Sequence, residues 1–121
     1  MDLNRTFVSI ACALLLAALV VPGIASAADD ARGQALFGLC AQCHGENAEG
    51  MKFALAPSIA GLDQWYIESQ LKMFKSGARG TNPDDVGGMR MHPMSLWLRG
   101  DEDITAVASY VASLPPTHPA P

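Results

Sequence analysis

A five-residue run, Cys40-Ala41-Gln42-Cys43-His44, constrains the fold of this chain more than any other feature of its sequence. The spacing places two thiols about one helical turn apart, and an imidazole follows the second thiol directly. One further cysteine, Cys12, lies in the apolar N-terminal segment. Two cysteines and a histidine at this spacing are compatible with four chemistries: a disulfide, a zinc site, a thioredoxin-like redox pair, or covalent attachment of haem.

The rest of the sequence weakens three of these alternatives. A disulfide is the default for two cysteines in an exported protein, but it leaves His44 unexplained. A structural zinc site needs four nitrogen or sulfur ligands, and no second cysteine pair follows. A thioredoxin-like pair needs a βαβ setting, and no useful stretch alternates with a period of two. The run matches the C-x-x-C-H signature of c-type haem attachment. We therefore predict one covalent haem c, with Cys40 and Cys43 bonded to its vinyl groups and His44 presented to its iron.

The N-terminal segment, residues 1–27, has the order of a secretory signal peptide. Arg5 precedes an apolar run over Phe7–Val21, and a small-residue Ala25-Ser26-Ala27 site follows Pro22-Gly23. We expect cleavage after Ala27 and a periplasmic mature protein without a membrane span. The alternative is an uncleaved anchor, but the apolar run is near the short end for a bilayer span and no stop-transfer charge cluster follows it.

The remaining residues, 28–121, are enough for one domain, with a core at about 30–114 and a Pro-rich tail at 115–121. The formal net charge of −4 argues against a nucleic-acid partner.

Periodicity predicts an all-α domain of three to four short helices joined by long loops. Helices are expected over Asp29–Leu39, Asp63–Phe74 and Asp101–Leu114, while 45–61 and 77–93 are expected to be loops because glycine and proline punctuate them. The second and last helices carry apolar stripes, which are Ile67, Leu71 and Phe74, and Ile104, Val107, Ala108, Val111 and Leu114. Such a domain has a thin core and needs an organising centre, which a haem would supply.

The sixth iron ligand is expected in the 87–94 segment, which offers Met89, Met91 and Met94. A methionine thioether favours Fe(II) and is the usual ligand where a haem transfers electrons. His92 is an alternative that would give a bis-histidine haem. The other large apolar side chains considered near the haem are Met73, Trp65, Trp97 and Phe53. For Met73 and the two tryptophans, an ordinary place in the core is the expected role.

Over residues 30–114 the chain resembles the class I cytochromes c, in particular their small bacterial monohaem branch. The resemblance rests on Gly33-Gln34-Ala35-Leu36-Phe37, the haem motif at 40–44, Ala56 to Leu62, and Tyr66 to Phe74. It implies the cytochrome c fold, with the first helix crossing the last one closely at Gly33 and Tyr110. It also implies that the Pro57 carbonyl accepts a hydrogen bond from the second ring nitrogen of His44.

The resemblance also indicates which methionine is the axial ligand. In the family this methionine stands about seven residues before an apolar residue that leads into an acidic helix start, and counting back from Leu98 gives Met91. The pair Arg99-Gly100 looks like one extra residue compared with the family pattern, which keeps Met94 and Met89 as alternatives.

The function implied is that of a non-enzymatic, periplasmic single-electron carrier of a respiratory chain. Its partners would be transient: a dehydrogenase or cytochrome complex as donor, and an oxidase or reductase as acceptor. One alternative is a dedicated haem subunit of a respiratory oxidoreductase. Another is a haem enzyme or gas sensor with an open sixth site, for which only His92 and Arg90 offer distal acid–base groups.

Overall fold

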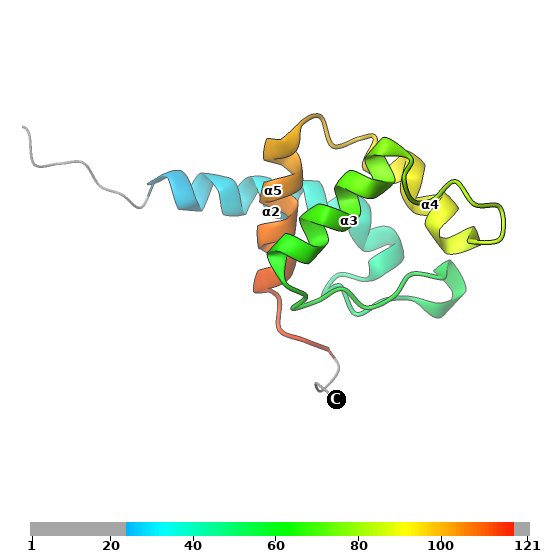
Figure 1. Cartoon of the computed structure of the whole chain (residues 1–121). Helices are drawn as coiled ribbons and strands as arrows, with labels where there is room; N and C mark the ends of the chain where they lie inside the picture. The colour runs from blue at the N-terminus through cyan, green and yellow to red at the C-terminus, as the bar shows by residue number, and fades with distance from the viewer. Residues whose placement is uncertain (1–23, 118–121) are drawn as a thin grey trace, which may run out of the picture.

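The computed structural model describes residues 24–117, with side chains from residue 27 onward, and shows an all-α domain. The elements in chain order are α2 (Ile24–His44), the 3₁₀ helix η2 (Lys52–Ala54), α3 (Gln64–Ser76), α4 (Val86–Ser95) and α5 (Asp101–Ser113) (Figure 1). Within residues 24–117 the only extended pairing is an isolated bridge between Met51 and Ala56. The predicted fold class is therefore confirmed. Most of the expected signal peptide, residues 1–27, lies outside the described residues.

The two terminal helices cross at a glycine. A methyl group on Gly33 of α2 would lie 2.3 Å from the carbonyl oxygen of Ala106 and 2.8 Å from Cβ of Tyr110, both on α5. One turn further along α2, the ring centroids of Phe37 and Tyr110 are 5.5 Å apart. The crossing expected from the resemblance is therefore present, and glycine is required at its closest point because any side chain would push the helices apart.

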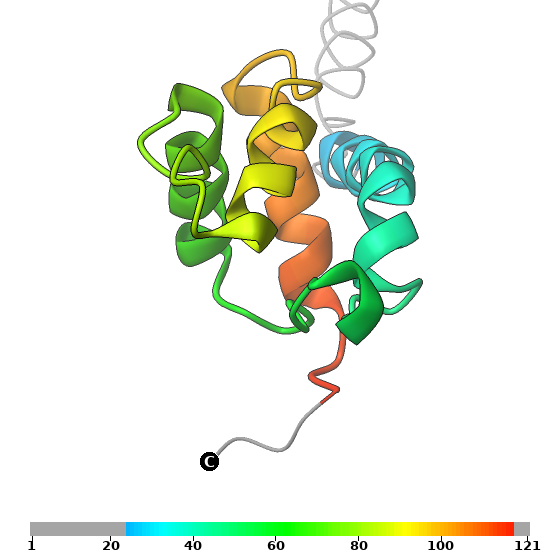
Figure 2. The ribbon, with the colours of Figure 1, turned by 90° about the vertical axis from the view of Figure 1, so that its right-hand side faces the viewer.

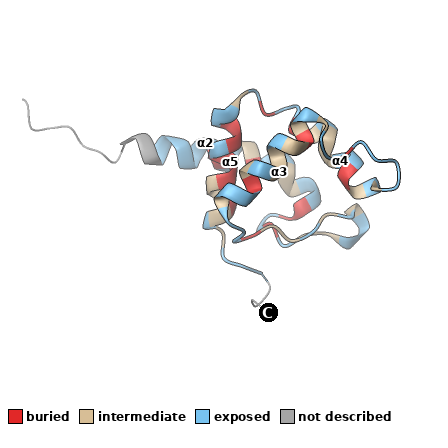
Figure 3. Ribbon diagram, in the orientation of Figure 1, coloured by how far each residue is buried: buried red, intermediate tan, exposed pale blue. Residues whose placement is uncertain are grey.

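Helix α5 is the centre of the core. It packs against α2 on one side and α3 on the other, an order that Figure 2 shows clearly. Its buried side chains include Ile104, Val107 and Val111, and Figure 3 shows its buried positions where it lies behind α3. From α3, Ile67 and Phe74 are buried, as their helical spacing predicted.

An ion pair joins the start of α5 to α2. The buried carboxylate of Asp103 accepts hydrogen bonds from the Arg99 backbone N–H at 2.8 Å and from the Arg32 guanidinium, whose Nε lies at 2.9 Å. The pKa of Asp103 is lowered, first by the Arg99 N–H and then by Arg32. The acidic start of the last helix therefore also fixes its position against the first helix.

Four expectations about local structure are wrong. Helix α2 extends beyond Asp29–Leu39 at both ends, so the haem motif forms its last turns. The segment 77–93 is not a loop throughout, because α4 forms at Val86–Ser95 with Pro93 inside it. Trp65 and Trp97 are not core residues, since 69% and 72% of their surfaces are exposed. Met73 is half-buried at the surface of α3 and does not enter the core.

Candidate haem site

The haem motif forms the C-terminal end of α2. Cys40 is half-buried, Cys43 is exposed, and no disulfide joins them. Burial raises the pKa of the Cys40 thiol. This is the opposite of the lowered thiol pKa on which a reactive redox cysteine depends. The helix holds the two thiols one turn apart, as attachment to two vinyl groups requires.

His44 is the last residue of α2 and is only 5% exposed. Its Nδ1 lies 2.9 Å from the carbonyl oxygen of Pro57, and this is the hydrogen bond that the resemblance implies. Because a carbonyl oxygen can only accept, Nδ1 carries the proton and Nε2 is the ring nitrogen with a free lone pair. Burial lowers the pKa of His44, which favours the neutral imidazole that can bind a metal.

The loop from Gly45 to Ala60 brings Pro57 to the histidine. The Gly50 N–H donates to the carbonyl oxygen of His44 at 2.6 Å, and a methyl on Gly50 would lie 2.7 Å from the carbonyl carbon of Pro57. Gly50 has a positive φ of 85°, so it permits both the turn and this close approach. The sequence marks Gly50 as punctuation but gives no sign of this contact.

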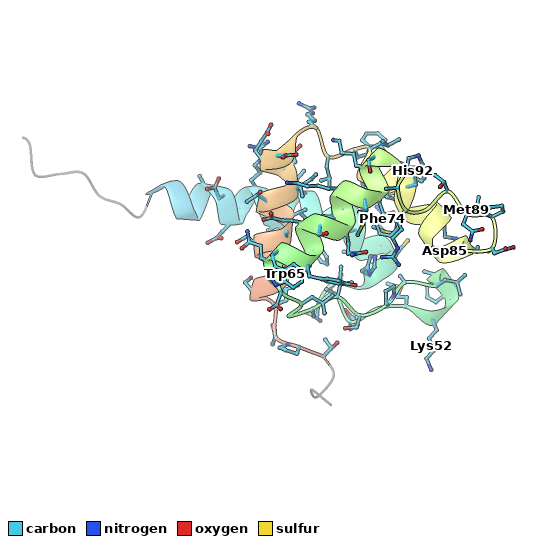
Figure 4. The ribbon with its side chains drawn as sticks, viewed as in Figure 1. Lys52, Trp65, Phe74, Asp85, Met89 and His92 are labelled. Carbon is cyan, nitrogen blue, oxygen red and sulfur yellow. The ribbon has the colours of Figure 1, made fainter. Side chains whose placement is uncertain are left out.

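The three candidate methionines lie on different sides of α4. Met91 stands three residues after buried Gly88 and four before buried Ser95, so it shares the inward side of the helix with them. Met94 is also half-buried and follows Arg90 by one turn. Met89 is 45% exposed, and Figure 4 shows it on the outer side of α4, away from α3. The geometry favours Met91 and Met94 over Met89.

Two polar side chains of α4 connect this helix to its surroundings. Arg90 donates from Nη1 to the carbonyl oxygen of Ala54 in η2 at 2.8 Å. His92 Nδ1 lies 2.6 Å from the carbonyl oxygen of Phe74 near the end of α3. Figure 4 shows His92 on the side of α4 nearer to α3, and its Nδ1 is committed there. This hydrogen bond occupies Nδ1 and leaves Nε2 with a free lone pair, so His92 stays an alternative ligand beside Met91.

One capping residue was missed by the sequence reasoning. Asp85 precedes α4, and its carboxylate accepts a hydrogen bond from the Gly88 N–H at 2.8 Å. An aspartate directly before a helical segment is a recognisable N-cap signal, so this residue could have indicated α4. Without that signal, the glycines and the proline of the segment favour a loop.

The residues present fit a covalently bound haem. Two thiols lie one turn apart, a buried neutral imidazole follows them, and a helix with two half-buried methionines packs on α3. Within the described residues no group of three or more His, Cys, Asp or Glu side chains could hold a metal ion. An all-α domain with this set of donors defines a class of protein, the small haem proteins with thioether attachment.

Comparisons with known proteins agree with this class. The sequence model of the Cytochrome c family matches residues 31–115, and the chain belongs to this family as a class I c-type cytochrome. It carries haem c with its iron, Cys40 and Cys43 fit the C-x-x-C-H attachment motif, and its chemistry is haem-based electron transfer. No solved structure gives a significant match to the chain.

Three relatives show how much of each related protein this chain covers. Cytochrome c-554(548) of Halomonas halodenitrificans is 35% identical over 88 residues, which is 72% of this chain and 98% of the relative. The thiosulfate dehydrogenase electron acceptor of Stutzerimonas stutzeri is 42% identical over 76 residues, or 63% of this chain and 32% of the relative. Cytochrome c4 of the same species is 33% identical over 121 residues, which is 92% of this chain and 51% of the relative. The chain thus spans from a third to nearly all of these relatives.

Proposed function

We propose that this protein is a periplasmic single-electron carrier with His44 and Met91 as the two axial ligands of its haem iron. When bound, the haem supplies the one-electron chemistry, as its iron changes between Fe(III) and Fe(II). The observation that carries the proposal is the hydrogen bond from His44 Nδ1 to the Pro57 carbonyl oxygen, because it leaves Nε2 as the ligand atom of a buried neutral ring.

The rest of the chain supports a closed, six-coordinate site. Met91 lies on the side of α4 that carries the buried Gly88 and Ser95, and it has the spacing from Leu98 that the family pattern gives to the axial methionine. A methionine opposite the histidine suits a carrier, because both ligands stay bound while the iron changes its oxidation state. Of the two acid–base groups that an enzyme or sensor would need, Arg90 donates to the Ala54 carbonyl oxygen, and His92 donates from Nδ1 to the Phe74 carbonyl oxygen and keeps only Nε2 free.

The redox partners that we propose are based on electron-transfer chemistry and on the name of one relative. A carrier needs an electron donor and an electron acceptor that dock transiently, and one relative is named as the electron acceptor of thiosulfate dehydrogenase. We propose a dehydrogenase or cytochrome complex as donor and an oxidase or reductase as acceptor. Among the described helices, none is long and apolar enough to cross a membrane. Permanent association with one oxidoreductase, as a dedicated haem subunit, is the second candidate.

Absorption spectra of the holoprotein, produced with a haem-ligation system, test the ligand assignment. We expect a c-type reduced spectrum, a weak far-red methionine-to-iron band in the oxidised protein, and no response to carbon monoxide. Met91→Leu should lose the far-red band and bind carbon monoxide, whereas the matched Met94→Leu and Met89→Leu variants should keep the wild-type spectrum. Loss of the band in Met94→Leu alone would move the assignment to Met94. A wild-type protein that lacks the band and binds carbon monoxide readily would favour the enzyme or sensor.

A further inference from the structure

Helix α4 differs from α3 and α5 in what holds it to the domain. Its buried residues are Gly88 and Ser95, so none of its large apolar side chains is buried. In contrast, α3 buries Ile67 and Phe74. A ten-residue helix is marginal on its own and usually relies on an apolar face for its position. Polar attachments to other elements therefore contribute to the position of the helix with the candidate methionines.

Two side-chain hydrogen bonds attach α4 to other elements, and their acceptor residues differ in burial. Arg90 reaches the Ala54 carbonyl of η2, a helix without buried residues. His92 reaches the Phe74 carbonyl, and the Phe74 side chain is only 6% exposed. The same carbonyl also accepts the Gly77 N–H at 3.1 Å, which closes the end of α3. Of the two hydrogen bonds, the one from His92 therefore connects α4 to the core.

The surroundings of His92 fit this role. A methyl on Gly77 would lie 3.8 Å from His92 Cε1, so the ring rests against the turn that ends α3. Ser95 Oγ donates to the His92 carbonyl oxygen at 2.7 Å and strengthens the last turn of α4. Because Phe74 offers a carbonyl oxygen, the His92 ring must donate from Nδ1. The N–H at Nδ1 of His92 thus forms a hydrogen bond that links α4 to α3.

We infer that His92 is a positioning residue: its hydrogen bond to the Phe74 carbonyl keeps α4 in place and so keeps the neighbouring Met91 on the haem iron. This inference rests on the proposed ligation by Met91. Loss of the hydrogen bond would let α4 move away from α3 more often, and an external ligand could then replace the thioether. The net contribution of one hydrogen bond corresponds to about a five- to tenfold change in such an opening equilibrium.

Ligand-exchange kinetics on the holoprotein test this role. Cyanide binding to the oxidised protein would be measured by stopped flow, together with the far-red band and thermal unfolding. His92→Ala should bind cyanide about five- to tenfold faster than wild type. His92→Asn should restore a slow rate, because the asparagine amide places an N–H donor close to the position of Nδ1. His92→Gln, which extends its donor toward the position of Nε2, should remain fast. Val86→Ala, an exposed change in the same helix, is the matched control and should behave as wild type.

The outcomes separate the inference from the proposed function. A wild-type protein without the far-red band would overturn the methionine ligation itself. A wild-type protein with the band, together with unchanged cyanide kinetics in His92→Ala, would overturn only the role of His92, even if the melting temperature fell. If His92→Ala does not accumulate as holoprotein, the cyanide-binding rates of His92→Asn and His92→Gln are compared instead to test the role of His92. Equal cyanide rates in those two variants would then refute the inference.

Discussion

The crossing of α2 and α5 makes a sharp prediction, because α2 contains two glycines in very different surroundings. A methyl on Gly33 would meet the Ala106 carbonyl oxygen at 2.3 Å and Tyr110 Cβ at 2.8 Å. A methyl on Gly38 would meet nothing within 4 Å. Both residues lie inside the same helix, so Gly33→Ala and Gly38→Ala change the helix propensity alike and differ only in packing.

We expect Gly38→Ala to raise the free energy of unfolding and Gly33→Ala to lower it. Replacement of glycine by alanine inside a helix favours folding by about 1 kcal/mol, so Gly38→Ala should stabilise the protein by up to about that amount. At Gly33 the same gain is opposed by an overpacking cost of about 1–3 kcal/mol. The upper end applies, because the nearest atom belongs to backbone that cannot rotate away. We expect Gly33→Ala to lose about 2 kcal/mol, which makes the two variants differ by about 3 kcal/mol, or roughly a hundredfold in the folding equilibrium.

Guanidinium denaturation of the oxidised holoproteins, followed by far-ultraviolet circular dichroism, measures this difference. The free energies of unfolding can be compared directly if the denaturant slopes of the two variants agree. The far-red band should survive in both, because neither glycine belongs to the haem motif. If Gly33→Ala is as stable as Gly38→Ala, the two helices can separate at no cost, and the argument that glycine is required at the crossing is refuted.

Three further predictions concern other parts of the chain. The pKa of Asp103 is lowered in the fold, so its stabilising contribution is present above the ordinary carboxyl pKa of about 3.9 and is lost as the pH falls through the lower folded value. Asp103→Asn should therefore lose less stability than wild type between pH 7 and pH 3 in denaturant titrations, and equal losses would contradict this. Asp85→Ala should remove the N-cap of α4 at a cost of about 1 kcal/mol and speed cyanide binding, whereas Asp84→Ala, at the exposed neighbour, should do neither. Mass spectrometry of the periplasmic fraction should find a chain that begins at Ala28, and an intact N-terminus in the membrane fraction would instead indicate an anchor.

Much of the fold could be predicted because its signals are local. The spacing of Ile67 and Phe74 indicates the buried side of α3, and Ile104, Val107 and Val111 do the same for α5. The haem motif could be predicted for a similar reason, since both thiols and the imidazole lie within one short run. Where one stretch of chain contains the whole pattern, sequence reasoning is sufficient.

Helix α4 shows where local reasoning fails. Gly87, Gly88 and Pro93 are all unfavourable inside a helix, so the segment reads as a loop. The helix forms because Asp85 caps it and because it packs closely on the end of α3. A methyl on Gly80 there would lie 2.4 Å from the Gly88 carbonyl oxygen. This contact explains why position 80 needs a glycine, and it joins the α4 backbone to a residue beyond the end of α3 that no local rule considers.

The loop that positions His44 shows the same limit through backbone strain. Ala48 has a left-handed φ of 58°, a conformation that costs a non-glycine residue about 1–2 kcal/mol. In this conformation its carbonyl oxygen accepts hydrogen bonds from the Ile59 and Ala60 N–H groups at 2.9 and 3.2 Å, and from Ser58 Oγ at 3.3 Å. These bonds close the loop on both sides of Pro57 and, at about 1 kcal/mol each, offset the strain. Glycine would adopt this φ freely, but the methyl of Ala48 is fully buried in the core cluster, where its burial favours folding by about 0.8 kcal/mol. An alanine in a strained turn thus serves the core and the haem histidine together, because the turn that buries its methyl also holds the Pro57 carbonyl against His44.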